Sequence, residues 1–163
     1  MESMKRIIGV MGGTSCTPEE YDLARAAGRM VAERGFVLLC GGGTGVMEAA
    51  ARGAKEAGGL TLGILPGSDA SGSPPNRHID IAVFTGLSDA RNAVNVKSAE
   101  VVIAIGGGHG TLSEIGLALR DGKPVIALKT WAMARDGADM SNFHPVETLE
   151  GLDALLDRFL KKP

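Results

Sequence analysis

The sequence predicts an α/β fold in which a doubly wound, mostly parallel sheet of six or seven strands carries helices on both faces. Short apolar runs alternate along the chain with segments of helical periodicity, which is typical of β-α-β units. Most of these runs are apolar throughout, as expected of parallel strands that are covered on both sides. No linker or repeat interrupts the pattern, so we expect one Rossmann-like domain over residues 1–163.

Six segments have the length and composition of buried strands. They cover residues 6–11, 36–40, 60–65, 81–84, 101–105 and 124–128. If the strands follow the order 3-2-1-4-5-6, the order reverses beside the first strand, and open α/β sheets bind ligands at such a point.

Five segments carry helix signals, and they cover residues 17–35, 44–57, 88–98, 111–122 and 149–160. In the first of them Thr17 has the position of an N-cap, Pro18 opens the first turn and Glu20 has the spacing of a capping box. Gly35 and Gly122 stand where glycine commonly ends a helix. Two connections, residues 67–78 and 132–144, are longer than packing requires, and they fit either binding loops or surface excursions.

Composition excludes several classes of function. The 163 residues carry 17 basic and 19 acidic side chains, a net charge of -2 that disfavours a dedicated nucleic-acid binder. No apolar run approaches the length of a membrane span, and residues 1–6 do not resemble a signal peptide. The two cysteines form no CxxC pair and the three histidines add no zinc spacing, so we expect no metal, no cofactor and a cytoplasmic location.

Glycine is the compositional anomaly, with 24 residues in the chain, roughly twice the usual share. Most of the informative glycines gather in three bursts, at residues 9–15 (GVMGGTS), 41–45 (GGGTG) and 106–111 (GGGHGT). Each burst follows a predicted strand and precedes a helix, so all three lie at the carboxyl edge of the sheet.

Glycine at such turns lets the backbone approach a ligand, and the free N–H groups of a helix N-terminus favour an anion. We therefore expect a phosphorylated ligand, with tight strand-to-helix turns as the alternative. The first burst lacks the GxGxxG spacing of dinucleotide sites, and neither later burst has the lysine of a GxxxxGK[ST] loop. A mononucleotide or a similar phosphate compound remains as the expected ligand.

The run GGHGTLSE at residues 107–114 resembles the GGxGTxxE motif of the LOG family, the cytokinin riboside 5′-monophosphate phosphoribohydrolases. Residues 40–47 (CGGGTGVM) resemble the family's GGGxxGLMG motif, residues 63–66 (GILP) its GxxP strand end, and Arg91 its active-site arginine. The family also carries the label "possible lysine decarboxylase". The sequence does not support that label, because it has no lysine in a recognisable pyridoxal-phosphate motif.

At two positions the chain departs from the LOG family pattern and resembles a side branch of the family instead. That branch includes non-catalytic molybdenum-cofactor carriers, which bind a pterin phosphate. The family has PGG where this chain has residues 106–108 (GGG), and Arg-Lys where this chain has Arg91-Asn92. The resemblance therefore implies either hydrolysis of the N-glycosidic bond of a nucleoside 5′-monophosphate or non-catalytic binding of a pterin phosphate. It also implies a homodimer or homotetramer.

The resemblance assigns a role to each candidate residue. Glu114 would stabilise an oxocarbenium-like state or activate water, and Arg91 would hold phosphate or ribose. The phosphate would bind at Gly107, Gly108, His109, Gly110 and Thr111, and the rest of the ligand at Gly12, Gly13, Thr14, Ser15, Gly42 and Gly43. Glu114 stands three residues after Thr111, so a capping box is an alternative, and Arg91 could instead be solvated or paired with Asp89.

Overall fold

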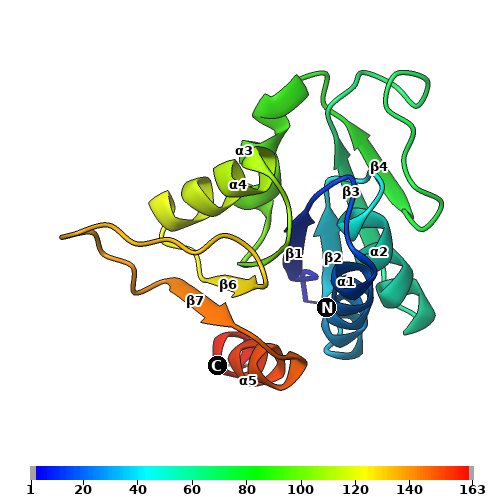
Figure 1. The fold of residues 1–163 in the computed structure, drawn as a ribbon. Coiled ribbons are helices and arrows are strands. Elements are labelled where there is room, and N and C mark those ends of the chain that lie inside the picture. Colours follow the sequence, from blue (N-terminus) through cyan, green and yellow to red (C-terminus); the bar gives the residue numbers. More distant parts are fainter. Residues whose placement is uncertain (1–2, 162–163) are drawn as a thin grey trace.

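The computed structural model describes residues 3–161 (Figure 1). Its elements are β1 (Ile7–Gly12), α1 (Pro18–Glu33), β2 (Val37–Cys40), α2 (Val46–Glu56), β3 (Thr61–Leu65), β4 (Ile81–Phe84), the 3-10 helix η1 (Ser88–Ala90), α3 (Arg91–Ser98), β5 (Val101–Ile105), α4 (His109–Arg120), β6 (Val125–Leu128), β7 (Phe143–Val146) and α5 (Leu149–Leu160). The six predicted strands and five predicted helices are confirmed within two residues of the expected bounds, except that the first three residues expected in the third helix, 88–90, form the 3-10 helix η1.

The strands form one parallel sheet of seven in the order β4-β3-β2-β1-β5-β6-β7. The predicted α/β fold class is therefore confirmed. The expected place of the fourth strand beside the first is wrong, because β5 pairs with β1 and β4 lies outside β3. The connection from β3 to β4 contains no helix that could carry the chain across the sheet, so β4 adds directly to the neighbouring strand.

The seventh strand, β7, escaped recognition as a strand in the sequence. Its four residues include His144 and Pro145 and lack an apolar run. Proline has no N–H to donate to a sheet, and it is tolerated at an edge, which is where β7 lies.

Helices cover both faces of the sheet, as a doubly wound fold requires. Contacts join α1 to α2 and to α5 on one face, and α3 to α4 on the other. Two apolar clusters result, one on each face, and the central strands β1, β5 and β6 contribute fully buried residues to both. The capping box predicted for α1 is confirmed, because the Thr17 hydroxyl accepts from the Glu20 N–H while the Glu20 carboxylate accepts from the Thr17 N–H.

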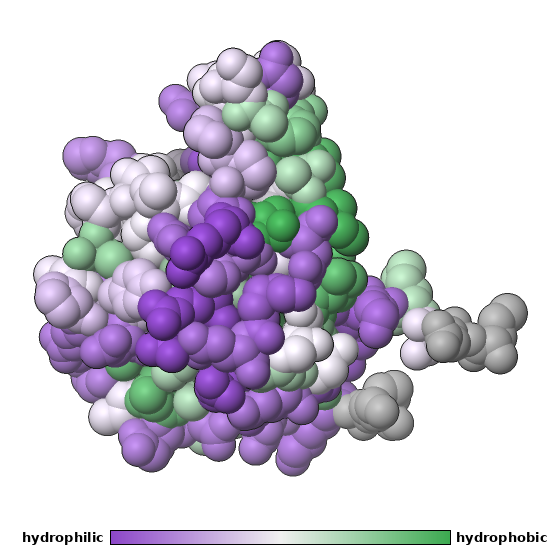
Figure 2. All heavy atoms as spheres, turned by 90° about the vertical axis from the view of Figure 1, so that its right-hand side faces the viewer, coloured by the Kyte–Doolittle hydropathy of each residue, from purple (hydrophilic) through white to green (hydrophobic). Residues whose placement is uncertain are grey.

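The β4 edge of the sheet leaves apolar side chains in contact with solvent. Ile81 and Val83 in β4 are 47% and 39% exposed, and Leu60 and Leu87 beside the strands are 37% and 50% exposed. Figure 2, which faces this edge, shows apolar surface along one side of an otherwise polar face.

Candidate functional site

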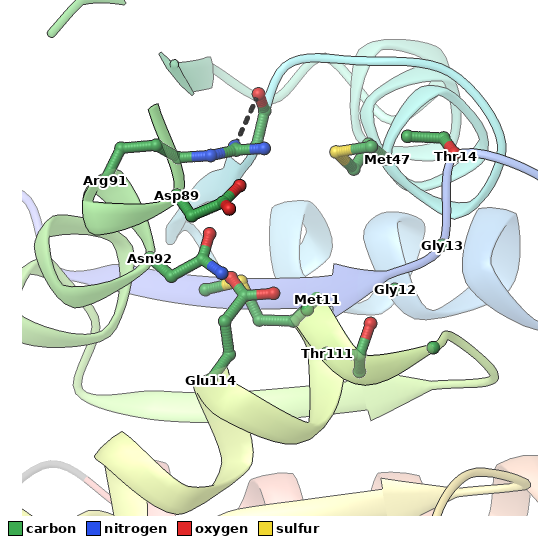
Figure 3. Close-up of a pocket in the computed structure, with 13 residues that line it drawn as sticks. Met11, Gly12, Gly13, Thr14, Met47, Asp89, Arg91, Asn92, Thr111 and Glu114 are labelled. Atoms are coloured by element: carbon green, nitrogen blue, oxygen red, sulfur yellow. Dashed lines mark hydrogen bonds between the residues drawn. The ribbon is translucent and has the colours of Figure 1, made fainter. Parts of the chain in front are cut away.

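A cavity of about 260 Å³ lies at the carboxyl edge of the sheet, where the turns after β1, β2 and β5 meet α3 and α4 (Figure 3). Because β1 and β5 are neighbours, the first and third glycine bursts approach each other here, as the sequence predicts. The strand order reverses at this point, which is where open α/β sheets bind ligands. The lining residues are Met11, Gly12, Gly13, Thr14, Gly41, Met47, Asp89, Arg91, Asn92, Gly108, Gly110, Thr111 and Glu114.

The third glycine burst forms the turn between β5 and the N-terminus of α4. Two of its carbonyl groups accept hydrogen bonds from the segment after β6: the Thr130 hydroxyl donates to the Gly106 oxygen at 2.5 Å, and the Trp131 indole N–H donates to the Gly108 oxygen at 3.0 Å. The N–H groups in the first turn of α4 have no partner within the helix. The turn therefore presents donors toward the cavity, the arrangement that helix N-termini use to bind phosphate.

Gly107 is the residue of this turn that leaves no room for a side chain. Its φ is +85°, and a Cβ there would lie 2.1 Å from the Thr111 Oγ1 and 2.5 Å from the Thr111 Cβ. Thr111 is only 3% exposed, and because its Cβ also clashes, rotation of the hydroxyl does not relieve the contact.

We expect Gly107→Ala to lower the free energy of unfolding by about 2 kcal/mol or more, because positive φ and the clash add. Binding of inorganic phosphate or a monophosphate at the turn should be lost with it. The matched control is Gly116→Ala in α4, the helix that follows the turn, where a Cβ meets nothing within 4 Å. That variant should be as stable as the parent or more so. Chemical denaturation and calorimetric titration measure both quantities, and normal stability and binding in Gly107→Ala would contradict this account of the turn.

Glu114 projects from α4 into the base of the cavity and is 7% exposed. Its Oε2 accepts a hydrogen bond from the Asn95 Nδ2 at 3.1 Å. Burial raises the pKa of the Glu114 carboxyl to about 7, against the opposing effects of the Asn95 amide and the Arg91 charge, which both favour the anion. The carboxyl is thus positioned to exchange a proton near neutral pH.

The capping-box alternative for Glu114 is wrong. The N-cap of α4 is Gly108 and no side chain caps the helix, so Thr111 lies inside the first turn and Glu114 one turn further along. The helix starts two residues earlier than expected because the last glycines of the burst enter it.

Arg91, the first residue of α3, contacts the ends of two strands. Its Nη1 donates to the Gly41 oxygen at 2.9 Å (Figure 3) and to the Ile64 oxygen at 2.8 Å. A Cβ at Gly41 would lie 2.2 Å from this nitrogen, so glycine is what lets the guanidinium approach. Within residues 3–161 no ion pair joins Arg91 to Asp89, and the pairing alternative is therefore wrong.

The first glycine burst contributes Gly12, Gly13 and Thr14 to the wall of the cavity, whereas Ser15 is outside it. Two hydrogen bonds tie this turn to the second burst and to the start of α2: the Thr44 hydroxyl donates to the Thr14 oxygen at 2.8 Å, and the Val46 N–H donates to the Gly13 oxygen at 3.0 Å. The two turns therefore form one rim of the site.

The second glycine burst serves mainly to anchor the connection 67–78. Asn76 donates its backbone N–H to the Gly42 oxygen at 2.8 Å and its side-chain amide to the Gly43 oxygen at 2.8 Å. Neither Gly42 nor Gly43 lines the cavity, and the burst reaches it through Gly41 instead.

Among the residues expected to bind phosphate, Gly108, Gly110 and Thr111 line the cavity. Gly107 does not line it, and the His109 ring packs 5.7 Å from the Trp131 ring, also outside the cavity. Sequence reasoning did not select Met11, Gly41, Met47, Asp89, Asn92 and Asn95 as site residues. Asp89 and Asn92 flank Arg91 in the sequence, and that proximity is the signal that could have found them.

Within residues 3–161, no three His, Cys, Asp or Glu side chains are arranged to hold a metal ion. None of the helices in the same part of the chain combines the length and apolar character of a membrane span.

Comparison with known proteins connects this geometry to a family, since a family model matches residues 5–151. The chain belongs to the SLOG cluster4 family. It is 30% identical over 120 residues to the cytokinin riboside 5′-monophosphate phosphoribohydrolase of Mycobacterium tuberculosis, a match that covers 69% of this chain and 64% of that enzyme. The chain thus spans just under two thirds of that relative's length.

Two solved structures of molybdenum cofactor proteins match nearly the entire SLOG cluster4 chain. The molybdenum cofactor binding protein of Rippkaea orientalis is 40% identical with a TM-score of 0.85, covering 98% of this chain and 100% of that one. The molybdenum cofactor carrier protein of Chlamydomonas reinhardtii is 36% identical with a TM-score of 0.85, covering 97% and 100%. The predicted resemblance to the LOG family and to the carrier branch is confirmed.

Proposed function

We propose that this protein binds a phosphorylated nucleoside in the cavity at the N-terminus of α4 and hydrolyses its N-glycosidic bond. The observation that carries the proposal is the buried Glu114 carboxyl, which lines the same cavity as the helix N-terminus. Burying an ionisable group is costly, so one retained at the wall of a ligand-sized cavity points to chemistry there. The relative from Mycobacterium tuberculosis, named for phosphoribohydrolase activity, supports the same reaction class.

In this reaction the C1′–N bond breaks, its electron pair leaves with the base, and water adds to C1′ to yield ribose 5-phosphate and free base. Positive charge develops on the ribose, and the anionic form of Glu114 stabilises it or takes a proton from the attacking water. The α4 N-terminus holds the phosphate through backbone N–H groups and the Thr111 hydroxyl. The remaining donors of the Arg91 guanidinium face the ligand beside Glu114.

A second candidate function is non-catalytic binding of a pterin phosphate. The match to the carrier from Chlamydomonas reinhardtii favours it, because that match covers 97% of this chain and 100% of the carrier. The same anion-binding turn would hold the phosphate of such a ligand.

The two functions separate in one experiment. The protein is incubated with AMP, GMP, CMP and UMP, free base is measured by chromatography, and binding of each monophosphate and of a pterin phosphate is measured by calorimetry. Release of base supports the hydrolase, whereas tight pterin phosphate binding without base release supports the carrier. If none of these compounds binds, both proposals are wrong.

The proposal extends to the setting of the protein. Net charge of -2 fits a protein that acts on a small molecule in the cytoplasm without nucleic acid. The apolar surface beside β4 supports assembly into a homodimer or homotetramer, since contiguous apolar surface commonly marks an interface.

A further inference from the structure

The Asp89 carboxylate lies at the mouth of the cavity, and the proposed reaction does not use this carboxylate. It belongs to η1, immediately before Arg91, and lines both the cavity and an adjoining outer groove over α3 and α4. Figure 3 shows its carboxylate directed toward the open part of the cavity. Within residues 3–161 no hydrogen bond or ion pair of the structure engages this carboxylate, and Arg91 donates to main-chain oxygens instead.

The cavity is therefore polarised. One side presents the N–H groups of the α4 N-terminus, and the other presents the Asp89 carboxylate with the Arg91 guanidinium beside it. A phosphate would be repelled by Asp89, so the part of the ligand that meets this side chain must donate hydrogen bonds.

The order of groups along the cavity suggests which part that is. In Figure 3 the Glu114 carboxyl lies between Thr111 and Asp89. With phosphate at Thr111 and C1′ at Glu114, as the proposed function requires, the base extends beyond Glu114 toward Asp89.

A carboxylate has two acceptor oxygens and no donor, so it pairs best with two adjacent N–H groups. Guanine and pterins share such an edge, a ring N–H beside an exocyclic amino group. Adenine has a ring nitrogen acceptor beside its amino group, and that acceptor would face a carboxylate oxygen unfavourably.

We propose that Asp89 is the specificity-determining residue of the site and selects ligands with a 2-amino-4-oxo edge, either a guanine nucleotide or a pterin phosphate. This inference rests on the proposed function, because that function places the heterocycle at this end of the cavity. The Asp89 carboxylate binds the heterocycle, while the turn before α4 binds the phosphate.

The test compares the dissociation constants of GMP, AMP, 2′-deoxy-GMP and 6-hydroxymethylpterin phosphate by calorimetry. The parent protein should bind GMP or the pterin phosphate at least tenfold more tightly than AMP, since each hydrogen bond to a charged group is lost with adenine. Whichever of GMP and the pterin phosphate binds more tightly is the class of ligand that supplies the 2-amino-4-oxo edge.

Asp89→Asn provides the decisive arm. Its amide can accept from the adenine amino group and donate to the neighbouring ring nitrogen, so preference should shift toward AMP while GMP and pterin phosphate binding weakens tenfold or more. A merely structural role would weaken all ligands alike. The matched control, Asp22→Asn, changes an exposed carboxylate on α1, on the opposite face of the sheet, and should leave every constant unchanged.

Three outcomes overturn the proposal. If neither GMP nor the pterin phosphate binds to the parent more tightly than AMP, Asp89 does not select the heterocycle, and the proposed function stays intact. Loss of affinity for 2′-deoxy-GMP, together with an Asp89→Asn effect on GMP and AMP alike, would assign the carboxylate to the ribose. Failure of all four ligands to bind overturns the proposed function together with this inference.

Discussion

Replacing Glu114 by Gln should lower the turnover of a nucleoside 5′-monophosphate by roughly a hundredfold or more, as for other key electrostatic groups. The amide keeps the size of the side chain, and its oxygen can still accept from the Asn95 Nδ2 that now holds the carboxylate at 3.1 Å. The affinity for the monophosphate should change far less, because the turn that we propose to bind the phosphate is untouched. Steady-state kinetics and calorimetric titration of the same preparations measure the two effects separately.

The pH dependence gives this prediction a second readout. Because the pKa of Glu114 is raised to about 7, the carboxyl is protonated below that pH and anionic above it. Turnover that needs the anion should therefore rise with pH through about 7 and level off, and Glu114→Gln should lack this limb. Glu150→Gln, an exposed carboxylate on α5, is the control and should match the parent. Equal turnover in Glu114→Gln and the parent would remove Glu114 from catalysis.

The fold could be predicted well from the sequence because its local signals agree with one another. Continuous apolar runs, the capping box at Thr17 and the helix-ending glycines all point to the same elements. Where the prediction failed, the local signal was weak: β7 is a short edge strand with a proline, and the place of β4 depends on a connection without a helix. Which strands pair in the sheet depends on tertiary packing, and the hydrophobic periodicity of the sequence does not determine it.

The candidate site was predictable in part. Its location at the turn before α4 follows from glycine positions, and Glu114 follows from the motif resemblance. The partner of Glu114 does not: Asn95 stands in a helix with nothing local to mark it, and only packing of α3 on α4 brings its amide to the carboxyl. Its Oδ1 is buried and lacks a partner among the described residues, a cost that sequence patterns do not reveal.

Arg91 shows the same division between motif and packing. The motif marks the residue, but its two main-chain acceptors, the oxygens of Gly41 and Ile64, lie 50 and 27 residues away in the sequence. The arginine therefore ties the ends of β2 and β3 to α3 as well as facing the cavity.

We expect Arg91→Ala to damage both stability and binding. Loss of two charge-assisted hydrogen bonds should lower the free energy of unfolding by about 3 kcal/mol, which is a fall in Tm of roughly 6–12 °C for a chain of this size. Affinity for the phosphorylated ligand should weaken by about tenfold to a hundredfold. Thermal unfolding with and without ligand, and calorimetric titration below the Tm of the variant, measure the two effects.

Arg91→Lys separates the two roles. A lysine ammonium could still donate to one or both strand-end carbonyls, so much of the stability should return. It cannot reproduce the planar fork of the guanidinium, so affinity should recover only in part. The control Arg120→Ala removes an exposed arginine at the end of α4 and should stay within about 0.5 kcal/mol of the parent. If Arg91→Ala binds the ligand as tightly as the parent and only its stability falls, then Arg91 is a structural tie, and the anion is held by the α4 turn alone.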